Sequence, residues 1–126
     1  MKITRFEDVE AWKEARELVK LVYSIVNDNL TLQKDYRFVN QIQAAAVSTM
    51  ANIAEGFARK SHKEFIQFLF ISKSSAAEVQ SHLYVAMDQG YITEKSFNEI
   101  YDKAEKVSKL TSGFIKYLTS QLKKPK

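Results

Sequence analysis

A short basic segment is the part of this sequence best suited to hold a ligand. Four cationic or imidazole side chains follow one another within five positions: Arg59, Lys60, His62 and Lys63. Together with the free backbone amides at the start of a following helix, they could cradle phosphate groups. They could equally form a solvated turn whose positive charge suits the end of the preceding helix. Both interpretations stay open on the residues alone.

A polar pair, Asn52 and Glu55, lies just before the basic segment. The two residues are three positions apart among alanines, so they share one face of a helix, where polar groups must be hydrogen-bonded if they are buried. One carboxylate and one amide make no recognisable reaction centre. We therefore favour structural hydrogen bonding for this pair over contact with a ligand or RNA.

Metal and catalytic chemistry find little support. Glu78 and His82 are spaced i, i+4 and could face a metal, but a di-iron bundle site uses about four carboxylates and two histidines. The chain has two histidines in all, no cysteine, no nucleophile elbow and no glycine-rich loop. The sequence predicts a non-enzymatic protein with no catalytic residue, no metal and no cofactor.

The elements that must position these residues are helices. With 126 residues, 3 glycines and 1 proline, the chain has the length of one domain and too few turn signals for a sandwich or barrel. Apolar residues recur at spacings of three and four over four segments, about 7–28, 36–58, 62–89 and 94–122, followed by a basic tail at 123–126. Short turns between them predict an all-α, antiparallel up-down-up-down four-helix bundle.

Helix ends are marked by local signals. Thr4 with Glu7, and Ser61 with Glu64, have the spacing of a capping box, which starts a helix. Gly90 is suited to the left-handed residue that ends one. The polar residues 31–35 are predicted to be the first turn.

The start of the third predicted helix is apolar on nearly every side. Its residues Phe65, Ile66, Phe68, Leu69, Phe70 and Ile71 occupy most of the circumference at 100° per residue. One bundle cannot cover all faces of one of its members, so we predict a subunit interface. Its candidates are Phe65, Ile66, Phe68, Phe70 and Ile71, with Trp12 of the first helix as a core or interface anchor.

Positive charge is concentrated toward the end of the chain. The net charge is +4, yet residues 106–126 carry six lysines and no acid, leaving 13 basic and 15 acidic side chains elsewhere. The predicted topology brings residues 59–63, the N-terminal residues and the C-terminal tail to one end of the bundle. A cyclic oligomer would repeat this basic end as a ring. Lys123 and Lys124 are further candidates, although a lysine tail is also a common solubilising device.

The expected location is the cytoplasm. An absence of cysteine fits a reducing compartment, and the N-terminal residues have no apolar signal-peptide core. No apolar run approaches the length of a membrane span, so a membrane partner is not expected.

Several motifs, in order, resemble one known family. They are F-E-D-V-E-A-W-K-E-A (6–15), Q-I-Q-A-A-A-V-S (41–48), N-I-A-E-G-F-A-R (52–59), K-E-F-I-Q-F-L (63–69) and A-x-x-x-G-Y-I (86–92). Together they resemble the bacterial four-helix-bundle proteins encoded in intervening sequences of 23S ribosomal RNA genes, to which the accessory variability protein of diversity-generating retroelements is related. The resemblance implies a ring-like homopentamer, with basic surface that binds nucleic acid in some members, and no established enzymatic activity.

Two functions follow as hypotheses. The first is a non-enzymatic homo-oligomer that binds nucleic acid, RNA or DNA, non-specifically through its basic end, with RNA favoured. The alternative is an interaction scaffold or accessory subunit for a protein partner such as a reverse transcriptase. The segregated charge and the family resemblance favour the first.

Overall fold

The protein is an all-α helical bundle. The computed structural model describes residues 3–123, and no strand occurs among them. A 3-10 helix, η1 (Phe6–Asp8), precedes one short and four long helices: α1 (Glu10–Asn27), α2 (Leu30–Gln33), α3 (Tyr36–Phe57), α4 (His62–Asp88) and α5 (Glu94–Leu122). The prediction on Lys124 lies outside the described residues.

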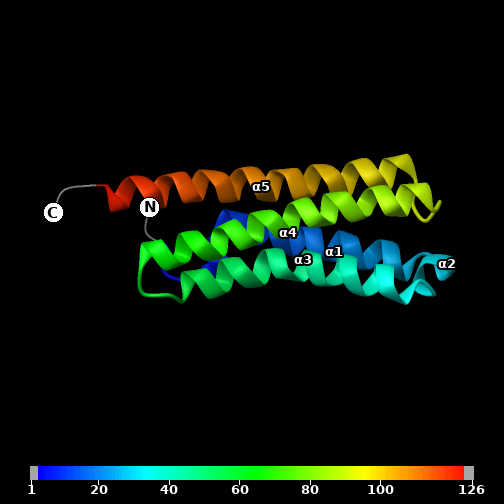
Figure 1. The fold of residues 1–126 in the computed structure, drawn as a ribbon, viewed down its shortest axis with the longest axis horizontal. Helices are drawn as coiled ribbons and strands as arrows, with labels where there is room; N and C mark the ends of the chain where they lie inside the picture. The colour runs from blue at the N-terminus through cyan, green and yellow to red at the C-terminus, as the bar shows by residue number, and fades with distance from the viewer. Residues whose placement is uncertain (1–2, 124–126) are drawn as a thin grey trace.

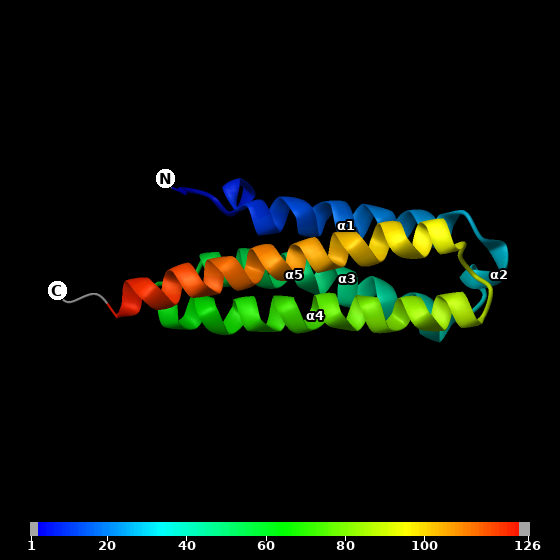
Figure 2. The same cartoon turned by 90° about the horizontal axis from the view of Figure 1, so that it is seen from above.

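The four long helices lie side by side along one axis. Turns between them fall at alternating ends, with the α3–α4 turn at one end and both α2 and the α4–α5 turn at the other (Figure 1). Helix α1 packs against α3 and α5, and α4 packs against the same two helices. Helix α5 extends past the start of α1 toward the end that carries the α3–α4 turn (Figure 2).

The start of the first helix differs from the sequence prediction. The predicted capping box of Thr4 and Glu7 does not form: neither η1 nor α1 has a side-chain cap, and the Glu7 carboxylate instead pairs with Arg5 at 2.9 Å. Val9 is fully buried, so the chain turns inward there and α1 begins at Glu10. The predicted first turn also holds a helix, α2, because Asn29 caps Leu32 N at 2.8 Å and Leu32 is fully buried.

The C-terminal end of α4 is formed as the sequence predicts. Gly90 adopts the left-handed region, with φ +72°, and its amide donates to Met87 O at 3.0 Å. The Tyr91 amide donates to Ala86 O at 2.8 Å, which completes a helix-ending motif. This motif favours glycine at its left-handed position, here Gly90, because a Cβ would be strained there. The Tyr91 hydroxyl then donates to Asp35 at 2.8 Å and joins this turn to the start of α3.

Helices α3 and α4 make the closest pair in the bundle. Small residues line the seam between them, and buried hydroxyls connect the two backbones: Ser72 Oγ donates to Thr49 O at 2.7 Å. Gly56 lies so close to α4 that a Cβ there would meet Phe65 Cδ1 and Phe68 Cβ at 2.8 Å each. The spacing of these helices therefore depends on glycine at position 56.

A half-buried ion cluster joins α1 to α5. Glu14 accepts a hydrogen bond from Lys103 Nζ at 2.8 Å, and Lys106 Nζ lies 3.4 Å from the same oxygen. The hydrogen bond from Lys103 is the main cause that lowers the pKa of Glu14, and it outweighs burial, which acts in the opposite direction. The ionised carboxylate therefore stabilises the folded state.

Replacing Glu14 by glutamine should lower the free energy of unfolding by about 1 kcal/mol at neutral pH. Because the pKa is lowered by folding, this contribution is present above the unfolded-state pKa and is lost as the pH falls through the folded-state pKa. Urea unfolding of both proteins at pH 7 and near pH 3 measures it. A difference of the same size at both pH values would contradict the assignment.

No helix within residues 3–123 is long and apolar enough to cross a membrane.

Candidate nucleic-acid interface

The basic segment forms the turn between α3 and α4. Helix α3 ends at Phe57 and α4 begins at His62. Ser61 caps α4 as predicted, because its Oγ accepts from Glu64 N at 3.1 Å and donates to Glu64 Oε1 at 3.2 Å. All four candidates, Arg59, Lys60, His62 and Lys63, are solvent-exposed.

Arg59 is occupied by contacts within the chain. Its guanidinium donates to Glu55 Oε1 at 3.0 Å and lies 4.8 Å from the centroid of the Phe68 ring. One side of the Arg59 guanidinium is therefore directed back at α3 and α4. Of the four candidates in the turn, Arg59 is the one least available to a phosphate.

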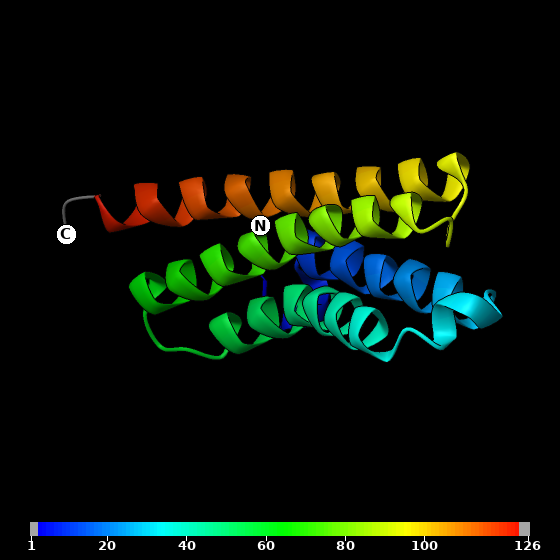
Figure 3. The same cartoon turned by 45° about the vertical axis from the view of Figure 1, so that its right-hand side comes forward.

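The lysines at this end are differently placed. Lys60 and Lys63 are exposed, and neither forms an ion pair with any described residue. The same holds for Lys116 of α5 and for Lys123, the residue after its last turn. The C-terminal end of α5 lies at the same end of the bundle as the α3–α4 turn (Figure 3). Four exposed ammonium groups thus point to solvent from one end.

Most carboxylates at this end are bound locally. Glu7 pairs with Arg5, Glu55 with Arg59, and Glu64 accepts from the Ser61 hydroxyl. Glu10 pairs with Lys13 at 3.4 Å. These acids therefore pair with Arg5, Arg59 and Lys13 or cap α4, while the four exposed lysines remain available to an external anion.

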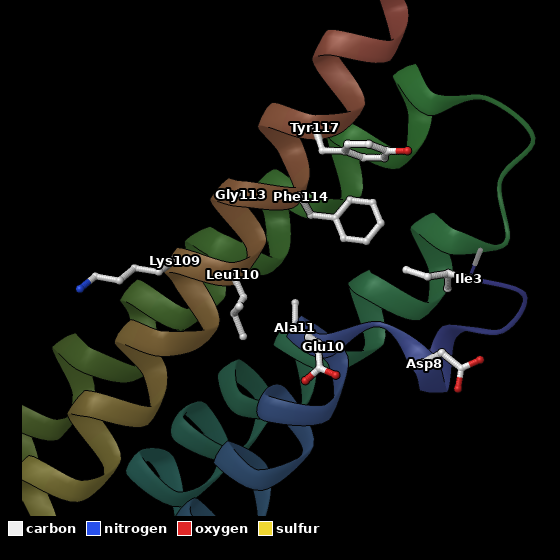
Figure 4. Close-up of a pocket in the computed structure, with 9 residues that line it drawn as sticks. All are labelled: Ile3, Asp8, Glu10, Ala11, Lys109, Leu110, Gly113, Phe114 and Tyr117. Atoms are coloured by element: carbon white, nitrogen blue, oxygen red, sulfur yellow. The ribbon is translucent and has the colours of Figure 1, made fainter. Parts of the chain in front are cut away.

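A hollow connects the turn to α5. It has a volume of about 300 Å³ and is lined by Ile3, Phe57, Arg59, Lys60, Ser61, His62, Phe65, Phe114, Tyr117 and Leu118. A second hollow of about 440 Å³ adjoins it between the start of α1 and α5, where Ile3, Phe114 and Tyr117 line both (Figure 4). We refer to them as the turn hollow and the α1–α5 hollow.

Sequence reasoning missed the α5 side of this interface. Phe114 belongs to the apolar periodicity of segment 94–122. Neither Phe114 nor Tyr117 was singled out as a site residue. Tyr117 is 57% exposed beside Lys116, and this adjacent basic–aromatic pair is the signal that could have identified it.

The polar pair separates into two roles. Asn52 Nδ2 donates to the backbone and to the hydroxyl oxygen of Ser48, both at 2.9 Å, and that hydroxyl lies 2.8 Å from Ser75 Oγ of α4. Asn52 thus takes part in the hydrogen bonding between α3 and α4. Glu55 is exposed and accepts a hydrogen bond from Arg59, so the prediction of buried structural hydrogen bonding is wrong for Glu55.

Glu78 and His82 lie together on α4. Glu78 Oε2 is 3.5 Å from His82 Nε2, which is buried and has no hydrogen-bond partner in the described chain. Within residues 3–123 no three His, Cys, Asp or Glu side chains converge to hold a metal ion. The two groups form an i, i+4 pair on the helix.

The interface candidates of α4 divide between the core and the surface. Phe65 is only 7% exposed, so it belongs to the core of its own chain rather than to an outer face, because α4 turns it toward α3 and α5. Ile66 and Phe68 are half-buried. Phe70 and Ile71 remain 52% and 48% exposed, so the bundle covers part of this apolar segment and leaves these two outside.

Trp12 is covered locally. The Phe6 ring packs edge-on against it at 5.1 Å, and the Arg16 guanidinium lies 6.0 Å from its centroid. It is half-buried and packs against the core of its own chain, and its place in a subunit interface stays a prediction.

These features define a class: a helical bundle that exposes several lysines at one end, around a hollow lined by aromatic residues. The family is identified by comparison with known proteins. The family model described as 23S rRNA-intervening sequence protein matches residues 7–113, and the chain belongs to this family.

A solved structure supports the same relationship. The chain is similar to a protein of unknown function from the S23 ribosomal protein family of Bacteroides thetaiotaomicron, with 28% sequence identity and a TM-score of 0.70. The alignment covers 84% of this chain and 94% of that one. A search of curated proteins gave no match.

Proposed function

We propose that this protein is a non-enzymatic, homo-oligomeric bundle that binds nucleic acid, principally RNA, without sequence specificity through its basic end. The single observation that carries the proposal is a group of four exposed lysines that form no ion pair within residues 3–123: Lys60, Lys63, Lys116 and Lys123. Exposed ammonium groups that release counterions from a phosphate backbone supply sequence-independent affinity. The expected compartment is the cytoplasm.

The distribution of charge supports an oriented interaction. At the opposite end, where α2 and the α4–α5 turn lie, acidic residues outnumber basic ones, with Asp28, Asp35, Asp88, Glu94 and Glu99 against Lys34, Arg37 and Lys95. A polyanion is therefore attracted to one end and repelled from the other. Such asymmetry distinguishes a binding surface from general solubilising charge.

The second part of the proposal concerns topology and assembly. Each chain is an antiparallel up-down-up-down four-helix bundle, and five such chains assemble into a ring-like homopentamer. Its support is the outward face of α4, where Phe70, Ile71, Tyr84 and Val85 are 43–55% exposed. Small or polar residues lie between them, and Glu78 is the one charged side chain among the exposed positions from 67 to 85. Such a face is suited to close contact with another helix, and a closed ring would place the lysines of every subunit on one side.

The same apolar face supports the alternative. A protein partner, such as a reverse transcriptase, could cover Phe70 and Ile71 instead of a second copy, and contact with nucleic acid would then be incidental. Capture of RNA by the isolated protein favours the first function. An isolated protein that remains monomeric and binds no RNA favours the second.

Charge reversal at the turn tests RNA binding. The double variant Lys60→Glu/Lys63→Glu should bind a mixed-sequence single-stranded RNA at least about tenfold more weakly than wild type, because two attractive contacts become repulsive. Arg59 is left unchanged, since its loss would also disturb Glu55. Fluorescence anisotropy measures the affinity.

The matched control is Lys34→Glu/Lys95→Glu, which makes the same change of charge at the opposite end. Both lysines are exposed and form no ion pair with a described residue. They lie several Debye lengths from the turn, since a helix of 29 residues is about 44 Å long. Equal loss of affinity in both double variants would refute a localised interface, and no binding by wild type would refute the function.

A further inference from the structure

We propose that the turn hollow and the α1–α5 hollow together form a binding site for one unpaired nucleotide of a single-stranded RNA, with the phosphate in the turn hollow and the base in the α1–α5 hollow. This inference rests on the proposed nucleic-acid function and gives it a specific site. The two hollows share Ile3, Phe114 and Tyr117, so a ligand can extend from one into the other.

The two hollows differ in polarity in the way that the two parts of a nucleotide do. Lys60 and His62 line the turn hollow. The α1–α5 hollow has a mainly apolar lining, and its one basic residue, Lys109, points away from the other lining side chains (Figure 4). Asp8 and Glu10 also line this hollow, and their carboxylates repel a phosphate there. The anionic group is thereby directed to the turn and the uncharged ring to α5.

Tyr117 is the stacking surface at the junction. Tyr117 is 57% exposed, and the contact of its ring with Phe114, at a centroid distance of 6.2 Å, begins a row of aromatic rings that continues inward. Phe114 contacts Phe65 at 5.2 Å, and Phe65 contacts Phe57 at 6.1 Å. An exposed ring that is held from behind by packed rings can stack on a base of any sequence.

The size of the site also fits this ligand. The α1–α5 hollow measures about 440 Å³ and the turn hollow about 300 Å³, within the range of small-molecule sites. Gly113 contributes to the larger hollow because a Cβ at this position would meet no atom within 4 Å. A base must leave its stack to enter, so the site selects single strands over duplexes.

The test compares a short single-stranded oligoadenylate with an abasic strand of the same length and charge. Wild type should bind the oligoadenylate about tenfold more tightly, which is the usual contribution of a stacked base. Tyr117→Ala should remove that preference and leave the affinity for the abasic strand unchanged. Tyr36→Ala, at the opposite end and 74% exposed, should change neither affinity.

Gly113→Leu tests the site from the other wall. A leucine at this position should occupy part of the α1–α5 hollow and abolish the preference for bases. The helix should persist, because leucine is a better helix former than glycine inside α5. A base-paired duplex should bind wild type and Tyr117→Ala equally.

Each remaining outcome would overturn the site. Equal binding of the two strands by wild type, or a preference that persists in both variants, would refute it while leaving the proposed function intact. Failure of both strands to bind would refute both. Adenosine monophosphate can also be tested as a competitor of the bound oligoadenylate. If it competes as effectively as oligoadenylate at the same nucleotide concentration, the site binds free nucleotides and its assignment to a strand is overturned.

Discussion

Gly56→Ala should lower the free energy of unfolding by about 2 kcal/mol, although alanine is the better helix former. The new methyl group would meet Phe65 Cδ1 and Phe68 Cβ at 2.8 Å. The Cβ of Phe68 is fixed to the α4 backbone, so relief requires the two helices to separate, at a cost of about 3 kcal/mol. The gain in helix propensity offsets about 1 kcal/mol of that cost.

Gly113→Ala is the matched control for this change. It makes the same substitution inside a long helix, where the new Cβ meets nothing within 4 Å. It should stabilise the protein by about 1 kcal/mol, so the two variants should differ by about 3 kcal/mol. Urea unfolding at one protein concentration measures both, because assembly would make stability depend on concentration. Equal stability of the two variants would contradict the close α3–α4 contact.

Phe70→Asp/Ile71→Asp should convert the assembled protein to single subunits. Light scattering on wild type should give a multiple of 14.5 kDa, and on the double variant 14.5 kDa. The reason is that two carboxylates would be buried without partners in an interface built on this face. Because both residues are about half exposed in the single chain, the variant should retain its helical circular dichroism.

Leu30→Asp/Tyr36→Asp is the control for that experiment. Leu30 and Tyr36 are 76% and 74% exposed and lie at the first positions of α2 and α3, where an aspartate is well tolerated. This variant should keep the mass of wild type. A wild type that is monomeric at micromolar concentration would contradict assembly altogether.

Local signals in the sequence were sufficient for most of the helical architecture. The apolar periodicity predicted the long helices closely. As predicted, Ser61 caps the start of α4 and Gly90 follows its end in the left-handed conformation. The same local signals failed at Thr4 and Glu7, because burial of Val9 and the Arg5–Glu7 ion pair determine how the chain enters α1. Tertiary packing therefore prevailed over a capping pattern at this point.

The candidate site was only partly predictable, because its parts are far apart in the sequence. The turn from Arg59 to Lys63 was found from its charge, but the engagement of Arg59 by Glu55 and Phe68 depends on side-chain geometry. Tyr117 lies near the turn only because α5 packs against α4 and extends past the start of α1. Helix periodicity predicts on which face of its own helix a residue lies. It does not predict whether the facing surfaces of two helices, here α1 and α5, leave a hollow between them.

The salt dependence of RNA binding tests the central claim most directly. For wild type, the logarithm of the association constant should fall linearly with the logarithm of salt concentration. In Lys60→Gln/Lys63→Gln the slope should be smaller by about 0.7 for each lysine that contacts a phosphate of a single strand. Lys34→Gln/Lys95→Gln should retain the wild-type slope. Binding that does not depend on salt, or one slope shared by all three proteins, would contradict a nucleic-acid interface at the basic end.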